Sequence, residues 1–181
     1  MKEQYKELKE DVLDEQKAID ETIERLLEIK DNFHPQRPEG HGLVPNKPEG
    51  DGWASDSPSH SQSQRQDYLT EPAMGTYLMN FYNGIENILK RISKEYYLII
   101  PKGNSWHKEL LVLSYSASEG KIAIFDQGIV ERIVPYKNFR HRFVSGYGFQ
   151  LKGEKMLELI NDVGPLWGDV KKAISGFFDR L

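Results

Sequence analysis

The sequence predicts an all-α fold, an antiparallel bundle of four to five helices. Two observations predict it: apolar residues recur at helical spacing over most of the chain, and no stretch makes a convincing sheet. A third observation divides the chain, since one segment rich in proline, glycine and serine interrupts the helical pattern. We therefore expect a first helix over residues 1–33, a loop over 34–66 and a helical core over 67–181.

Length and composition set limits on the function. The 181 residues suffice for one domain. The absence of cysteine excludes disulfides, thiolate metal sites and cysteine nucleophiles, and it fits a cytoplasmic protein. A net charge of -4 means that any nucleic-acid contact needs a local basic patch. The apolar runs fall far below the ~20 residues needed to span a bilayer, and the charged N-terminus differs from a signal peptide, so no membrane contact is expected.

The first region predicts one long amphipathic helix from about Lys2 to Phe33. Its apolar stripe repeats every seven residues: Tyr5, Val12, Ile19, Leu26 and Phe33. Glu15 and Thr22 interrupt the stripe, so the coiled-coil signal is weak. We expect one face of this helix to pack on the core, with packing against a partner helix as the alternative.

The second region, residues 34–66, predicts a flexible loop. It holds five of the nine prolines and buries almost nothing apolar. His34, His41 and His60 lack metal-ligand spacing, so we expect them to be solvated. Trp53 is either an anchor for a partner or simply exposed.

The core begins with a helix predicted from the Thr70–Glu71–Pro72 start to about Tyr96. Its buried face carries Leu78, Phe81, Ile85, Ile88, Leu89 and Ile92. Gly84, inside this helix, costs ~1 kcal/mol relative to alanine. We expect that glycine to admit a close helix neighbour.

Three further helical segments follow. Asn104 or Ser105 caps a short helix that carries Trp106, Leu110, Leu111 and Leu113. Residues 121–125 fit a strand by composition, but we expect a loop that leads to Asp126 as the cap of a helix over about 127–143, kinked at Pro135. The inward positions of that helix are Ile129, Ile133, Tyr136 and either Phe139 or Arg140. The last region predicts two helical pieces, separated at Gly164–Pro165.

Common catalytic motifs are absent. The chain has no phosphate-binding glycine loop, dinucleotide fingerprint, zinc-protease helix or nucleophile elbow. The acidic residues of the first helix (Glu10, Asp11, Asp14 and Glu15) fit a solvated face. One cluster remains, since Lys137, Arg140, His141 and Arg142 lie within six positions. On charge alone these residues fit a solvated helix end, where cations complement the helix dipole.

The segment from Arg140 to Tyr147 resembles the catalytic motif of the HEPN superfamily: an Arg, four variable residues, a His, any residue and a Tyr. Arg140 matches the Arg and Tyr147 the Tyr, whereas Ser145 stands at the position of the His. Residues 79–86, 106–111 and 139–151 resemble successive helices of the HepT-like toxins, a branch of that superfamily. The resemblance covers roughly Asp67 to Leu181.

The resemblance implies a function. HepT-like proteins are helical bundles that pair as homodimers, and many are metal-independent endoribonucleases acting as toxins. Their partner is a minimal nucleotidyltransferase antitoxin, which transfers AMP to the motif tyrosine. The resemblance thus implies Arg140, His141 and Ser145 as catalytic positions and Tyr147 as the AMP acceptor. Lys137 and Arg142 are then expected to bind RNA, with no cofactor and no metal.

The chemistry of these residues leaves alternatives open. Metal-free RNA cleavage needs a base, an acid and a cation, and the planar fork of Arg140 supplies the cation. An unactivated serine hydroxyl cannot replace histidine in proton transfer. His141 lies one helical turn before Ser145 and is the candidate to take over, whereas His107 fits a structural residue. The alternatives are an inactive module that binds RNA or the nucleotidyltransferase, and a helical scaffold that recruits other proteins.

Overall fold

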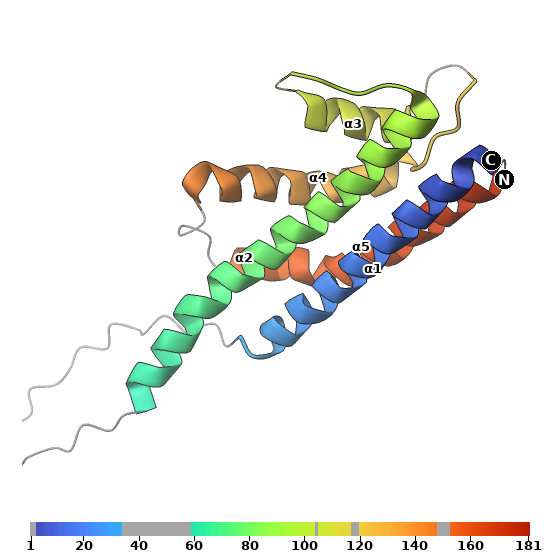
Figure 1. Cartoon of the computed structure of the whole chain (residues 1–181). Helices are drawn as coiled ribbons and strands as arrows, with labels where there is room; N and C mark the ends of the chain where they lie inside the picture. The colour runs from blue at the N-terminus through green and yellow to red at the C-terminus, as the bar shows by residue number, and fades with distance from the viewer. Residues whose placement is uncertain (1–2, 34–58, 104, 117–119, 148–152) are drawn as a thin grey trace, which may run out of the picture.

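The computed structural model of the chain describes residues 3–33, 59–103, 105–116, 120–147 and 153–181. This part of the chain contains five α-helices and no strand, which confirms the all-α bundle. The helices are α1 (Lys6–Asp31), α2 (Ser59–Ile92), α3 (Trp106–Tyr115), α4 (Gln127–Arg142) and α5 (Gly153–Asp179). Figure 1 shows α1 running antiparallel to α2 and α5, with α3 and α4 on the other side of α2.

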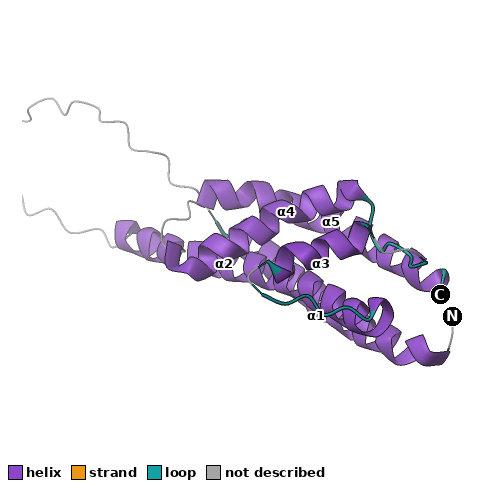
Figure 2. Ribbon diagram, turned by 90° about the horizontal axis from the view of Figure 1, so that it is seen from above, coloured by secondary structure: helices purple, strands orange, loops and turns teal. Residues whose placement is uncertain are grey.

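The N-terminal helix packs on the core along one face, as its pattern predicts. A single 3₁₀ turn, Glu3–Tyr5, precedes α1. The buried face of α1 consists of Leu8, Val12, Ile19, Ile23 and Leu26. Figure 2 shows the same bundle from above, with α1 on the opposite side of the molecule from α4. Because this apolar face is already covered by helices of the same chain, its burial needs no partner helix.

The start of α2 differs from the prediction. The helix begins at Ser59 rather than Thr70, so Pro72 lies in its interior. Residues 59–66 of the expected loop are therefore helical, because the glutamines and Arg65 in that stretch are good helix formers. The rest of the expected loop, including His34, His41 and Trp53, lies outside the described residues, as does the side chain of His60.

The break expected at Gly164–Pro165 was wrong, since α5 continues through both residues. Proline removes one backbone hydrogen bond from a helix. Here Val163, Leu166 and Trp167 are all buried beside it, so tertiary packing on both sides of the proline holds the helix together. The helix α4 likewise continues through Pro135.

The predicted cap of α4 is confirmed. The Asp126 carboxylate accepts a hydrogen bond from the Ile129 backbone N–H at 2.8 Å. Residues 121–125 form a loop rather than a strand, and the backbone N–H groups of Ile124 and Phe125 donate to the Ser114 carbonyl. The Ser105 hydroxyl does not cap the backbone of α3 but donates to Glu109 at 2.6 Å, and Asn104 lies outside the described residues.

Gly84 allows α1 and α2 to approach closely, as expected. A Cβ atom at this position would lie 2.7 Å from Cδ1 of Ile19, a fully buried residue of α1. A side chain of any size therefore conflicts with the present spacing of the two helices. No helix in the described part of the chain has both the length and the apolar character needed to cross a membrane.

Candidate functional site

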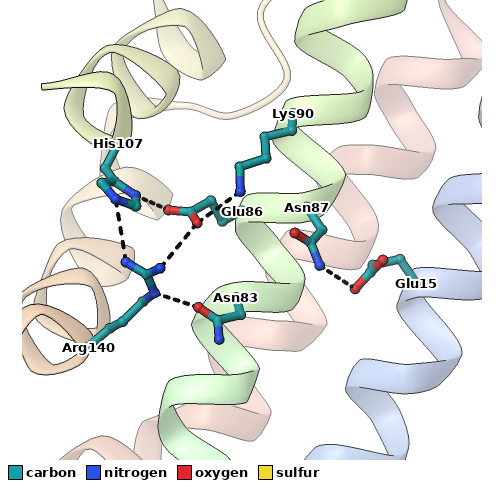
Figure 3. A network of polar contacts seen from close by, with 7 residues as sticks. All are labelled: Glu15, Asn83, Glu86, Asn87, Lys90, His107 and Arg140. Atoms are coloured by element: carbon teal, nitrogen blue, oxygen red, sulfur yellow. Dashed lines mark hydrogen bonds and ion pairs between the residues drawn. The ribbon is translucent and has the colours of Figure 1, made fainter. Parts of the chain in front are cut away.

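Side chains from α2, α3 and α4 meet in one polar cluster, which we define as Asn83, Glu86, Lys90, His107 and Arg140 (Figure 3). Asn83, Glu86 and Lys90 occupy successive turns of α2, so they share one face of that helix. His107 belongs to the first turn of α3, and Arg140 to the last turn of α4.

Buried apolar neighbours place these polar side chains. Arg140 follows Phe139, which packs in the core, and Asn83 follows the buried Tyr82. On α3, Leu110 and Leu111 anchor the helix to the core and bring its first turn over α2. The cluster is therefore a product of core packing on all three helices.

Glu86 is the centre of the cluster. Its side chain is only 2% exposed, and its two oxygens face different partners. One oxygen accepts a close hydrogen bond from Nδ1 of His107. The other lies 3.3 Å from the Lys90 ammonium and 4.0 Å from Nη2 of Arg140. A carboxylate this deeply buried is tolerable only because several donors surround it.

The charge of Glu86 also affects the pKa of the neighbouring Tyr82. Burial raises the pKa of the Tyr82 phenol well above its ordinary range, and the neighbouring Glu86 carboxylate raises it further. Tyr82 therefore stays neutral beside the carboxylate and acts as a hydrogen-bonding group rather than a base.

Arg140 keeps part of its guanidinium available. Its Nε donates to the Asn83 side-chain oxygen at 2.5 Å, and Nη1 lies 3.5 Å from Nε2 of His107. A guanidinium carries five N–H donors, so these contacts leave donors unused. The side chain is 26% exposed, so part of it is in contact with solvent.

His107 is oriented on three sides. Because a carboxylate only accepts hydrogen bonds, the contact with Glu86 assigns the proton of the neutral ring to Nδ1. Nε2 is then left with a lone pair on the side of Arg140. The Trp106 ring lies against the imidazole, with centroids 3.5 Å apart, and Lys90 sits 4.3 Å over the Trp106 ring.

The structure brings only one of the predicted catalytic residues into the cluster, namely Arg140. His141 and Ser145 are exposed, and the Ser145 hydroxyl donates to the His141 carbonyl oxygen at 2.7 Å. Among the contacts that the structure describes, neither side chain joins the polar cluster. Lys137 is partly buried and Arg142 is exposed on the same helix. The backbone of Tyr147 ends the π-helical turn that follows α4, but its side chain lies outside the described part of the chain.

Sequence reasoning missed most of the residues that surround Arg140. Asn83, Glu86 and His107 were not proposed as site residues, although one signal pointed to them. Glu86 lies one turn from both Tyr82 and Leu89 on the apolar face of its helix, where an unpaired carboxylate would be costly. Such a position requires partners from another helix. Among the described residues, no group of three or more histidines and carboxylates could hold a metal ion.

Comparison with known proteins adds the family. A family model described as "HepT-like protein" matches residues 73–181. The match covers more than half of the chain and contains every residue of the polar cluster. No curated protein and no solved structure matches the chain.

Proposed function

Because this chain belongs to the HepT-like family, we propose that it is a metal-independent endoribonuclease, the toxin of a toxin–antitoxin pair, and that its polar cluster cuts RNA. One observation carries the proposal: the Arg140 guanidinium contacts side chains of α2 and α3, yet its side chain remains partly exposed. An arginine fork that is held in place and still reachable suits a phosphate group.

The charge of the cluster supports an anionic substrate. Lys90 and Arg140 are two cations around the single carboxylate of Glu86, so basic groups outnumber acidic ones in the cluster. Lys137 and Arg142 add positive charge along α4. The whole chain is acidic, with a net charge of -4, so this local excess is the patch that RNA would need.

Arg140 has a defined part in the reaction. When the ribose 2′-oxygen attacks the adjacent phosphorus, negative charge accumulates on the phosphoryl oxygens. A guanidinium already held by Asn83 and Glu86 stabilises that charge without reorganising. The requirement for a 2′-hydroxyl predicts cleavage of RNA and not of DNA.

The test is an RNA cleavage assay in the presence of a metal chelator. We expect the wild type to cut RNA, leaving 2′,3′-cyclic phosphate and 5′-hydroxyl ends, and to leave DNA of the same sequence intact. Arg140→Ala should lower the rate by about 10²–10³-fold, as does removal of one preorganised donor elsewhere. Arg140→Lys keeps the charge but not the fork and should be nearly as impaired.

Lys172→Ala is the matched control, since Lys172 is an exposed cation of α5 that pairs only weakly with Asp169, at 3.8 Å. It should cut at the wild-type rate. A wild type that cuts no RNA, or an Arg140→Ala variant that cuts as fast as the wild type, rejects the ribonuclease proposal.

The proposed partner is a minimal nucleotidyltransferase antitoxin, with Tyr147 as the acceptor of AMP and a homodimer as the active form. Incubation with that partner and labelled ATP should label the wild type but not Tyr147→Phe. Equal labelling of the two proteins rejects Tyr147 as the acceptor.

A second candidate function is an RNA-binding module without cleavage. Ser145 favours it, because the hydroxyl at the family's histidine position donates to its own helix and offers no proton-transfer group. RNA binding that depends on Arg140, with no cleavage by the wild type, would select this alternative.

A further inference from the structure

We propose that His107, oriented by Glu86, is the proton-transfer residue of this site and accepts the proton of the substrate's 2′-hydroxyl. This inference rests on the proposed ribonuclease function, and it assigns the proton transfer to a residue of α3, outside the Arg140–Tyr147 segment. The substrate class is an RNA phosphodiester with a free 2′-hydroxyl.

Among the side chains that the structure describes, no other group close to Arg140 suits this step. The Ser145 hydroxyl is committed to the His141 carbonyl oxygen, and His141 itself is exposed on a different side of α4 from Arg140. Tyr82 and Glu86 are too deeply buried to meet a substrate. His107 is the titratable side chain of the cluster that both contacts Arg140 and reaches solvent, with 26% of its side chain exposed.

Its arrangement is that of a carboxylate-oriented general base. Glu86 accepts from Nδ1, which fixes the tautomer and leaves the lone pair on Nε2. After Nε2 takes up a proton, the same carboxylate stabilises the resulting imidazolium. Trp106 lies against the ring and limits its rotation.

Nε2 of His107 lies beside the guanidinium that we expect to bind the phosphate. Nε2 lies 3.5 Å from Nη1 of Arg140, a long contact that a substrate can displace. A phosphate bound by the Arg140 fork carries its neighbouring ribose within reach of Nε2. General base catalysis requires that the base lie within hydrogen-bond distance of the proton it removes.

The reaction balances without a further reactant. Nε2 of His107 takes the 2′-hydroxyl proton while the 2′-oxygen forms a bond to phosphorus. The bond from phosphorus to the 5′-oxygen breaks, and this leaving oxygen takes a proton from water. The hydroxide produced then removes the proton from His107, which returns to its neutral form. The products are a 2′,3′-cyclic phosphate and a 5′-hydroxyl.

His107→Asn separates proton transfer from structure. An asparagine amide can donate to Glu86 much as Nδ1 does, but it cannot accept a proton at neutral pH. We expect cleavage to fall about 10²–10⁴-fold, while RNA affinity and Tm stay at wild-type values. The matched variant His141→Asn removes the histidine that the sequence favoured, and it should lose far less activity than His107→Asn.

Two further measurements guard against a variant that fails for structural reasons. Added imidazole should restore part of the activity of His107→Ala, because it supplies the missing base. Glu86 is a positioning residue, so Glu86→Gln should lower kcat while KM and Tm stay near their wild-type values, whereas a purely structural role would change Tm or KM as well.

The outcomes distinguish this inference from the proposed function. A wild type that cuts no RNA overturns both. A wild type that cuts RNA, together with a folded His107→Asn or His107→Ala variant that cuts equally fast, overturns only the role of His107. A greater loss in His141→Asn than in His107→Asn also overturns it, and assigns the proton transfer to His141.

Discussion

The contact between Gly84 and Ile19 gives a quantitative test of the helix packing. In Gly84→Ala two effects oppose one another. Alanine is a better helix former than glycine by about 1 kcal/mol. The added methyl group, however, would lie 2.7 Å from Cδ1 of Ile19, and overpacking of this kind typically costs about 1–3 kcal/mol. The net expectation is a change from near zero to a destabilisation of about 2 kcal/mol.

A double-mutant cycle separates the two effects. Ile19→Ala removes both side-chain atoms nearest to the new methyl group, and the loss of this buried residue should cost about 2–5 kcal/mol. In that background Gly84→Ala no longer meets an obstacle, so it should stabilise the protein by about 1 kcal/mol. The substitution at Gly84 therefore changes sign with the residue at position 19, a coupling of about 1–3 kcal/mol.

The assay is urea unfolding followed by circular dichroism, with the free energy of unfolding compared at equal m-values. Gly168→Ala in α5 is the matched control, because no atom lies within 4 Å of the Cβ it would add. It should stabilise by up to about 1 kcal/mol. If Gly84→Ala stabilises the wild type as much as Gly168→Ala does, α1 and α2 do not approach as closely as described.

Three further predictions concern other parts of the bundle. Trp167→Phe removes the indole N–H that donates to Asp20 at 2.6 Å and also leaves a cavity where the buried indole packs, so the free energy of unfolding should fall by about 1–3 kcal/mol, as measured by urea unfolding. Asp126→Ala removes the cap of α4 and should cost about 1 kcal/mol in the same assay, whereas Asp126→Asn, which keeps a capping oxygen, should cost little. Burial raises the pKa values of Tyr82, Tyr97 and Tyr136 above the ordinary value of about 10. The folded state therefore holds these protons more tightly than the unfolded state, so their contribution to stability is complete below about pH 10 and is lost as the pH rises further. Ultraviolet absorbance during an alkaline titration should show these three phenols ionising only as the protein unfolds, and ionisation in the folded protein would contradict their burial.

Local signals in the sequence predicted much of the fold. The Asp126 cap follows from a side chain that satisfies a backbone N–H three residues later, so it is visible in a short window. The buried stripe of α1 follows from spacing alone. The prediction of helix boundaries at Pro72 and Pro165 was wrong, because both prolines lie inside helices. Trp167, which helps to hold α5 intact beside Pro165, contacts Phe81 and Asp20, and both are distant from it in sequence.

In the site, too, local signals were predictive and long-range contacts were not. Arg140 was predictable because a linear motif contains it. Its partners were not, because Asn83 lies 57 residues away in sequence and His107 lies 33 residues away. Helical spacing shows which face a residue occupies, but not which face of another helix it meets. The buried carboxylate of Glu86 was a local indication that polar side chains of another helix must contact α2 at this position.

The burial of Glu86 has a consequence for laboratory evolution of this protein. Replacing a buried ionic group and its partners together by apolar residues is often neutral or stabilising, whereas removing one member is strongly unfavourable. Selection for thermostability is therefore expected to favour apolar residues at Glu86 and its partners, whereas selection for activity should favour the polar residues now present. Libraries that vary positions 86, 107 and 140 together and are selected only for heat resistance should converge on apolar triplets. Selection for RNA cleavage should instead retain the Glu, His and Arg as a set, and sequencing the survivors of both selections would reveal the conflict.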